Sequence, residues 1–401
     1  MINKKNRLVG AILLVSGTTI GAGMLALPVT TGLAGFFPSL LIMTFIWLFM
    51  MLTAFYFLEV NLRMKGESNL ISMIHKTLGR PGEAVAWVTY LLLLYALTSA
   101  YLLGCSQILS DFLQGAFSFT VPRWVWPTAI FIFFGIFVYL GTAVADFLNR
   151  FMIMGLVIAY IVLVVIGSSS VNPVMLTHIN WAFLLPSVSV VLTTFGFHII
   201  IPTLTTYLEH DAKLLKRAIF IGSLIPFLVY VIWQFLVMGV VPVYGADSLS
   251  EAAIKGLQVT FVLKILLGSP WVGLAVRAFA FFAIVTSLLG VSLSLSDFLA
   301  DGLKIKKTHW GKFFLILLTF VPPLLFALFY PQGFILALQY AGIFVVVLLA
   351  LLPAFMVWAE RYGPKGQRGF EKIDFKVPGG KVALIGTILV SLLLLGIEVF
   401  V

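Results

Sequence analysis

The chain has 401 residues, of which 61% are hydrophobic and 10% are charged, and its net charge is +10. Soluble domains usually carry about a quarter charged residues, so this composition excludes a soluble protein. Apolar runs recur along the whole length, and they reach the roughly 18 residues that a helix needs to cross a hydrocarbon core. The single cysteine, Cys105, lies in one of these runs and cannot form an intramolecular disulfide.

Apolar runs separated by charge clusters and by Pro or Gly breaks predict an all-α integral membrane protein with about eleven transmembrane helices. Six are predicted near residues 8–35, 38–62, 83–112, 125–145, 147–167 and 181–207, and five more near 217–241, 270–299, 312–330, 332–358 and 381–400. Two connections, 68–78 and 248–267, are predicted to form short amphipathic helices at the membrane surface. The polar segment 361–381 is interpreted as a loop.

Positive charges are distributed unequally between the loops. With the N-terminus inside, 21 Lys and Arg residues lie in cytoplasmic loops, whereas only Arg123, Lys255 and Lys264 lie outside. Cytoplasmic loops of membrane proteins carry the excess of Lys and Arg, so the N-terminus is predicted to be cytoplasmic and the C-terminus periplasmic. The basic charge therefore faces anionic membrane lipid and does not indicate nucleic-acid binding.

Two distant segments share a sequence pattern. Residues 15–28 read VSGTTIGAGMLALP and residues 191–202 read VLTTFGFHIIIP, so both contain Thr-Thr-apolar-Gly followed by a proline. With five spans in each unit, the second copy starts on the opposite side of the membrane. The pattern predicts inverted repeats at about 8–167 and 181–358 in a single transmembrane domain, with an extra helix at 381–400.

Glycines interrupt the first span. Gly17, Gly21 and Gly23 lie in its middle, where each glycine weakens a helix by about 1 kcal/mol relative to alanine. Transporters built from inverted repeats use such breaks, because half-helix ends and freed carbonyls bind the substrate there. The alternative is that Gly17 and Gly21 form a GxxxG contact between packed helices. The matching pattern at Gly196 favours a binding site.

Stretches along the whole chain resemble the bacterial aromatic amino acid permeases, the hydroxy and aromatic amino acid permease family, and most closely its tyrosine-specific members. They include SGTTIGAGMLALP at 16–28, YALTSAY at 95–101, TTFGFH at 193–198 and TSLLGVSLSLSDFLAD at 286–301. The resemblance implies a LeuT-type five-plus-five inverted repeat with one extra helix, and proton-coupled uptake of tyrosine across the bacterial inner membrane. Bulky Ile199, Ile200 and Ile201 depart from the tyrosine carriers, so tryptophan or a broader aromatic range stays open.

A zwitterionic amino acid needs amide donors, carbonyl acceptors and an apolar slot. We expect amides at 20–23 to bind the carboxylate, carbonyls of Thr19 and Phe195 to bind the ammonium, and aromatic rings to hold the side chain. His198 lies deep in a span and is a candidate partner for a tyrosine hydroxyl or a proton carrier; the alternative is a histidine bonded to a neighbouring helix. The predicted substrate-binding residues are Thr19, Ile20, Gly21, Ala22, Gly23, Tyr95, Phe195, Gly196, Phe197 and His198.

The eighth span contains a possible cation site. Ala283, Thr286 and Ser287 place a carbonyl and two hydroxyls together, and in sodium-coupled relatives of this superfold such a pattern completes a site with first-span carbonyls, here those of Gly17 and Ile20. Oxygen ligands suit small hard cations. The family favours a proton whereas the pattern favours sodium, and hydrogen bonding of Thr and Ser within their own helix is the alternative.

Three ionisable residues in the spans are further candidates, because such groups in membranes are often functional. Glu59 and Asp297 are candidates for cation coupling. Both lie near cytoplasmic span ends, where a charged side chain can reach water at a low free-energy cost, so a structural role is the alternative. Arg277 is expected to line an outer vestibule.

Other classes of function lack support in the sequence. A channel needs rings of charges or filter carbonyls, and an enzyme needs a nucleophile with its base, a metal cluster or a cofactor loop. None of these patterns is present, so neither a cofactor nor a bound metal is expected. The expected partners are an aromatic amino acid and membrane lipid, with no obligate protein partner. We predict a secondary active transporter that imports an aromatic amino acid, above all tyrosine.

Overall fold

The computed structural model describes residues 4–64, 66, 68–117, 121–268, 270–363 and 375–400. No strand occurs in these ranges, which confirms the predicted all-α class. The first half contains α1 (Lys4–Thr19), α2 (Gly23–Thr31), α3 (Phe36–Leu62), α4 (Leu70–Phe117), α5 (Val125–Leu140), α6 (Thr142–Gly167), α7 (Val188–Thr194) and α8 (Ile201–Tyr207). The second half contains α9 (Ala212–Val240), α10 (Leu249–Lys255), α11 (Val259–Leu267), α12 (Pro270–Gly302), α13 (His309–Phe329), α14 (Phe334–Val345), α15 (Leu352–Tyr362) and α16 (Gly380–Phe400).

The helices agree with a multi-pass membrane protein. Within the described ranges, nine helical segments are long and apolar enough to cross a membrane, and the bent pair α1 and α2 makes a tenth. The remaining predicted span, 125–145, corresponds to α5, which has only 16 residues. It ends earlier than predicted because Gly141 has φ 96°, a conformation that favours glycine and separates α5 from α6.

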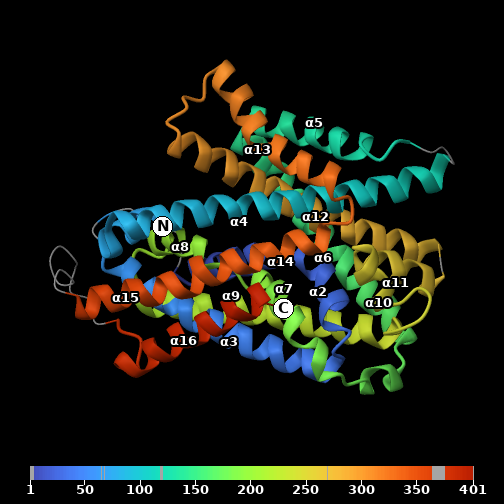
Figure 1. Ribbon diagram of the computed structural model, residues 1–401, viewed down its shortest axis with the longest axis horizontal. Coiled ribbons are helices and arrows are strands. Elements are labelled where there is room, and N and C mark those ends of the chain that lie inside the picture. The colour runs from blue at the N-terminus through green and yellow to red at the C-terminus, as the bar shows by residue number, and fades with distance from the viewer. Residues whose placement is uncertain are drawn as a thin grey trace.

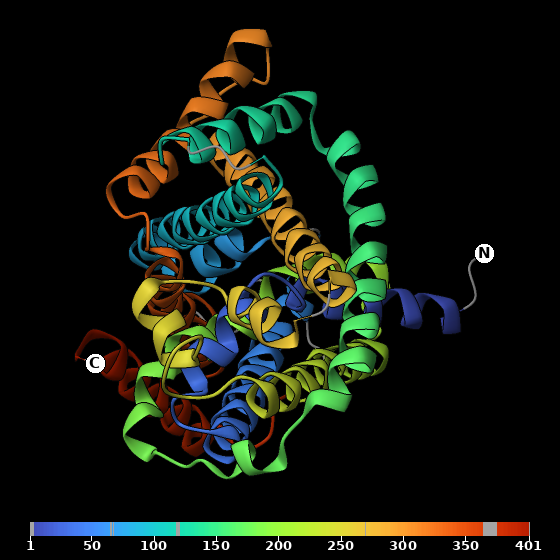
Figure 2. The ribbon, with the colours of Figure 1, turned by 90° about the vertical axis from the view of Figure 1, so that its right-hand side faces the viewer.

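Many of the long helices lie roughly along one common direction, with short helices at both ends (Figure 1), whereas α6 runs across that direction (Figure 2). α10 and α11 lie at one end, whereas α8 and the end of α15 lie towards the other. α5 and α13 pack beside each other as an outer layer against α4 (Figure 2). The predicted surface helices correspond to the start of α4 and to the pair α10 and α11. The inverted repeat itself stays a prediction.

Helix α9 fixes the first span in place. The Ser16 hydroxyl donates to the Gly222 carbonyl oxygen at 2.9 Å, and a Cβ on Gly222 would lie 2.6 Å from Val15 Cβ. The Trp233 indole donates to the Met24 carbonyl oxygen at 2.8 Å. Glycine at 222 thus lets α9 approach α1 closely, while Trp233 holds α2, so one helix positions both halves of the span.

Candidate functional site

The first span is broken at its middle. α1 ends at Thr19, α2 begins at Gly23, and their axes differ by 56°. Backbone groups at such helix ends lack some of their helical partners. The Ala22 amide donates instead to Ser287 Oγ of α12 at 2.9 Å. A Cβ on Gly21 would lie 2.7 Å from the same oxygen, so glycine is what allows α12 to reach the break.

Gly17 does not pack against another helix. A Cβ built there would meet no atom within 4 Å, and the residue is exposed in the middle of its span. A GxxxG contact would place atoms of a neighbouring helix at that position. The structure therefore favours the binding-site interpretation of this glycine over the packing interpretation.

The sixth span has a second break. α7 ends at Thr194 and α8 begins at Ile201, with non-helical residues and a short 3₁₀ turn between them. The breaks touch, because a Cβ on Gly23 would lie 2.9 Å from Thr194 Cγ2. The buried hydroxyl of Tyr230 on α9 lies 2.7 Å from the Thr19 carbonyl oxygen and 3.4 Å from that of Thr194. Tyr230 therefore joins the two breaks.

A cavity of about 310 Å³ lies against both breaks. This volume is at the lower end of the range for small-molecule sites, about 300 to 1,000 Å³. Residues of α1, α4, α6, α7, α12 and the π-helical turn after α14 line it, and none of the lining side chains in the described ranges is charged. The predicted residues that line this central cavity are Gly17, Thr19, Ile20, Gly21, Gly23, Gly196, Phe197, Thr286 and Ser287.

Four predicted substrate-binding residues lie outside the cavity wall, and Ala22, Tyr95 and Phe195 are three of them. Ala22 is buried, and its amide is already used by Ser287. The Tyr95 hydroxyl donates to the Leu318 carbonyl oxygen of α13 at 2.8 Å, so this ring points to the outer layer. Phe195 is fully buried, and its ring packs against Tyr230 with centroids 5.5 Å apart.

His198 also faces away from the cavity. Its Nε2 lies 2.9 Å from Thr53 Oγ1 of α3, and this hydroxyl also lies 3.1 Å from the Met50 carbonyl oxygen. Because the hydroxyl has one hydrogen to give, the direction of the bond between Thr53 and Nε2 follows the tautomer of His198. The arrangement matches the alternative of a histidine bonded to a neighbouring helix.

The candidate cation residues of α12 are engaged within their own helix. The Ser287 hydroxyl donates to the Ala283 carbonyl oxygen at 2.9 Å. The Thr286 hydroxyl lies 2.8 Å from the Phe282 carbonyl oxygen and 3.1 Å from that of Ala283. Ala283 itself is buried and does not line the cavity. The predicted alternative of hydrogen bonds within the helix is thus present, although Thr286 and Ser287 still face the cavity.

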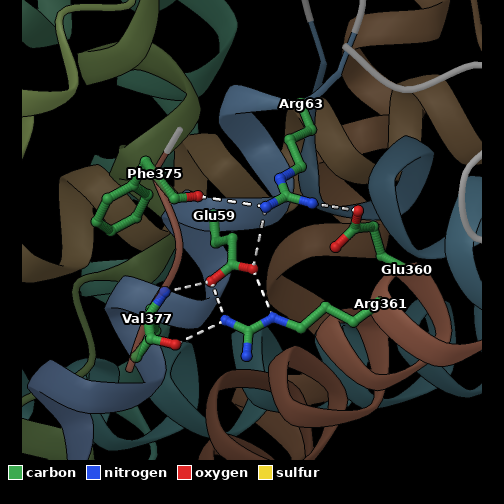
Figure 3. A network of polar contacts seen from close by, with 6 residues as sticks. All are labelled: Glu59, Arg63, Glu360, Arg361, Phe375 and Val377. Carbon is green, nitrogen blue, oxygen red and sulfur yellow. Dashed lines mark hydrogen bonds and ion pairs between the residues drawn. The ribbon is translucent and has the colours of Figure 1, made fainter. Parts of the chain in front are cut away.

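Glu59 belongs to a buried ion-pair network and not to the cavity (Figure 3). Its carboxylate accepts hydrogen bonds from Arg361 Nε and the Val377 amide, each at 2.7 Å, and Arg63 Nη2 lies 3.5 Å away. Arg63 also pairs with Glu360. Two carboxylates and two guanidinium groups balance in charge, which indicates that Glu59 holds α3, α15 and the segment before α16 together.

The other ionisable candidates lie at the ends of the molecule. Asp297 pairs with Lys307 at 2.7 Å, and both side chains are about half exposed. Arg277 lies 3.4 Å from an Asp111 oxygen, and Lys264 Nζ donates to the same carboxylate at 2.6 Å. This Asp111 cluster joins α4, α11 and α12, and sequence reasoning did not predict it.

Several lining residues were missed by sequence reasoning. Tyr90, Leu94, Leu97 and Tyr101 line the cavity from one face of α4, and their spacing of three and four residues is helical. Asn149 of α6 also lines the cavity, and its buried Oδ1 has no hydrogen-bond partner in the described part of the chain. The helical spacing was a detectable signal, whereas nothing in the sequence shows which face of α4 is turned inward.

A helical membrane bundle with two touching helix breaks around an uncharged cavity has the architecture of a membrane transporter. Residues 4–398 match the tryptophan/tyrosine permease family. The tyrosine-specific transport system 1 of Haemophilus influenzae is 34% identical, over 98% of this chain and 96% of that protein. The tryptophan-specific transport protein of the same organism is 31% identical over the same shares, and glutamine transporter 2 of Aliivibrio fischeri is 29% identical over 97% and 98%. The chain belongs to the tryptophan/tyrosine permease family, which confirms the predicted family and a transport protein in place of an enzyme.

Proposed function

We propose that the protein is a secondary active transporter that imports tyrosine across the bacterial inner membrane, with a cytoplasmic N-terminus and a periplasmic C-terminus. The observation that carries the proposal is the uncharged cavity at the contact of two broken helices. The tyrosine-specific and tryptophan-specific relatives support an aromatic substrate. Tryptophan is the main alternative substrate.

The two helix breaks supply a partner for the carboxylate and a partner for the ammonium group of an amino acid. α1 and α7 end at the cavity, and α2 and α8 begin near it. Helix N-termini favour anions and helix C-termini favour cations. Because the Ile20 and Ala22 amides already donate to Ser16 and Ser287, the carboxylate binds at the amides of Gly21 and Gly23. The ammonium binds carbonyls at the ends of α1 and α7. A zwitterion has no net charge, so dipoles can bind it without a charged side chain.

The remaining wall is apolar and receives the ring. Leu94, Leu97, Phe197, Val345 and Leu349 line the cavity, and such surfaces hold aromatic side chains through burial and ring contacts. We assign the substrate hydroxyl to Asn149, whose Oδ1 lacks a partner in the described part of the chain, in place of His198. An indole N–H would fit the same acceptor, so tryptophan shares this partner with tyrosine.

We infer that a proton is the coupling ion. The Ser287 hydroxyl already donates to the Ala283 carbonyl and accepts from the Ala22 amide, and the Thr286 hydroxyl donates within α12. A sodium ion would need these oxygens to reorient toward it, because it takes several oxygen ligands at once. Sodium symport is the alternative.

Uptake of labelled tyrosine into proteoliposomes, under separately imposed proton and sodium gradients, tests the proposal. We expect saturable, competitive accumulation with a proton gradient alone. Strict dependence on sodium would overturn the choice of ion, and linear uptake without saturation would indicate a channel. Cysteine labelling at both chain ends, with reagents applied to one side of the membrane, tests the topology; labelling of both ends from one side would contradict it.

A further inference from the structure

The central cavity is followed by a second chamber. This chamber has a volume of about 570 Å³, and Tyr90 and Ile199 line both it and the central cavity. The segments 68–71 and 202–207 border it, and they adjoin the loops on the face predicted to be cytoplasmic. The two spaces thus lie in series, with Tyr90 and Ile199 as the partition between them.

One wall of the second chamber is a supported aromatic surface. Phe298 of α12 lies edge-to-face with Tyr90 at a centroid distance of 4.8 Å. Trp87 of α4 lies 5.0 Å from Phe298 and helps to hold that ring in place. Aromatic pairs in this geometry contribute beyond the area that they bury. The aromatic ring of a bound molecule can therefore pack against Phe298 and Tyr90, whose rings are already held in place.

Polar but uncharged residues also line the second chamber. Asn69 and Thr203 line the chamber together with Tyr207 at the end of α8. A Cβ on Gly10 would lie 2.6 Å from the Tyr207 hydroxyl, so α1 lies directly behind Tyr207. None of the chamber's lining side chains in the described ranges is charged. An unpaired ion would bind poorly there. A zwitterion carries no net charge, and its aromatic ring can pack against Phe298 and Tyr90.

We propose that the second chamber is a separate binding site for the aromatic amino acid, occupied on the way between the central cavity and the basic face. The proposal rests on the proposed function, since it takes the substrate to be an aromatic amino acid. It predicts that tyrosine binds here even when the central cavity is blocked.

Thiol labelling tests this site directly. Cys105 is the only cysteine, so a Cys105→Ser, Thr203→Cys protein carries one thiol, at an exposed position of the chamber. Tyrosine at about ten times its dissociation constant should slow labelling about tenfold, because the free fraction of a site falls as 1/(1 + [L]/Kd). Alanine, which has no ring, should not slow it. Tyrosine uptake by the wild type is measured in parallel and reports on the proposed function.

The decisive measurement adds Gly196→Leu, which fills the central cavity, with Leu97→Trp as a second blocking variant in case the first fails to fold. Protection of Thr203→Cys that persists in a blocked protein supports the second site. Protection that disappears would show that it arises from the central cavity, and absence of protection in every variant would likewise overturn the inference. If the wild type takes up no tyrosine, the proposed function fails instead.

Phe298→Ala checks the aromatic wall against a matched control on the same helix. Phe298→Ala should remove the protection in the blocked protein, whereas Phe281→Ala, an exposed ring outside both spaces, should leave it intact. Phe298→Leu serves as a milder variant if the alanine protein is unstable. Equal protection in the Phe298 and Phe281 variants would contradict the assignment of the ring to this wall.

Discussion

The central cavity and the ion-pair network around Glu59 differ in the kind of polar groups that they bury. The cavity is lined by backbone, hydroxyl, amide and apolar groups without a charged side chain in the described ranges. The network places the charges of Glu59, Arg63, Glu360 and Arg361 in largely buried positions and pairs them. In this protein, paired buried charges therefore lie where helices are held together. The candidate site has no charged side chain among its described lining residues.

The physical reason is the cost of an unpaired charge away from water. A buried ion is tolerated only with a partner of good geometry, and Glu59 finds one in Arg361. A charged side chain in the cavity would be unpaired whenever the substrate left. Helix-end dipoles avoid this cost, because they need no counter-ion in the empty state. Variants of the central cavity and of the Glu59 network test this contrast.

Filling the central cavity should have the largest effect. Gly21→Leu or Gly196→Leu should abolish uptake, because a Cβ at Gly21 already meets Ser287 Oγ at 2.7 Å and one at Gly196 meets Leu349 at 3.3 Å. Gly386→Leu on α16 is the control, since no atom lies within 4 Å of a Cβ there. Uptake is normalised to the amount of folded protein in the membrane. Normal uptake by a well-expressed Gly196→Leu protein would refute the site.

Breaking the network should lower the free energy of unfolding more than it lowers the transport rate of the folded protein. Glu59→Gln leaves Arg361 without its charged partner, and removing one member of a buried pair typically costs about 3 to 5 kcal/mol. The double variant Glu59→Gln, Arg361→Gln should be more stable than the single one. Unfolding of the purified protein measures the difference. A stable Glu59→Gln protein that exchanges tyrosine but cannot concentrate it would instead assign cation coupling to Glu59.

The polar group that recognises the substrate hydroxyl can be identified by a paired test. Asn149→Leu should narrow the preference for tyrosine over phenylalanine by about 1 to 3 kcal/mol, because a site built around a hydrogen bond rejects the analogue that lacks it. His198→Leu should keep the wild-type ranking, since His198 bonds to Thr53. Competition assays measure both. Loss of concentrative uptake with intact exchange in His198→Leu would assign proton transfer to this histidine.

The smallest effects are expected in α12. Ser287→Ala removes the hydrogen bond to the Ala22 amide, which is worth about 1 kcal/mol, so uptake should fall only several-fold. Thr286→Ala should have a similar or smaller effect. Initial rates with and without sodium provide the measurement. Sodium dependence that disappears in these variants would contradict proton coupling.

The sequence predicted the helix breaks but not the side-chain directions around them. Glycines in mid-span and their second copy are local signals, and both breaks occur where these signals lie. His198 follows Gly196 by two residues, yet it faces α3, and the backbone between α7 and α8 is not α-helical. Tyr95 and Tyr101 share one motif, but only Tyr101 faces the cavity. The rotation of a helix depends on its neighbours, which a single span does not encode.

The Asp111 cluster ties three helices together at the face that is predicted to be periplasmic. In this conformation the central cavity adjoins the chamber on the basic face, while Lys264 and Arg277 hold α11 and α12 to α4 at the opposite face. Salt screens partly buried ion pairs much less than exposed ones, and the Lys264 and Asp111 side chains are only 20% and 23% exposed. A change in salinity should therefore leave this closure largely intact, so that the resting conformation of the carrier depends little on the salt content of the surrounding medium.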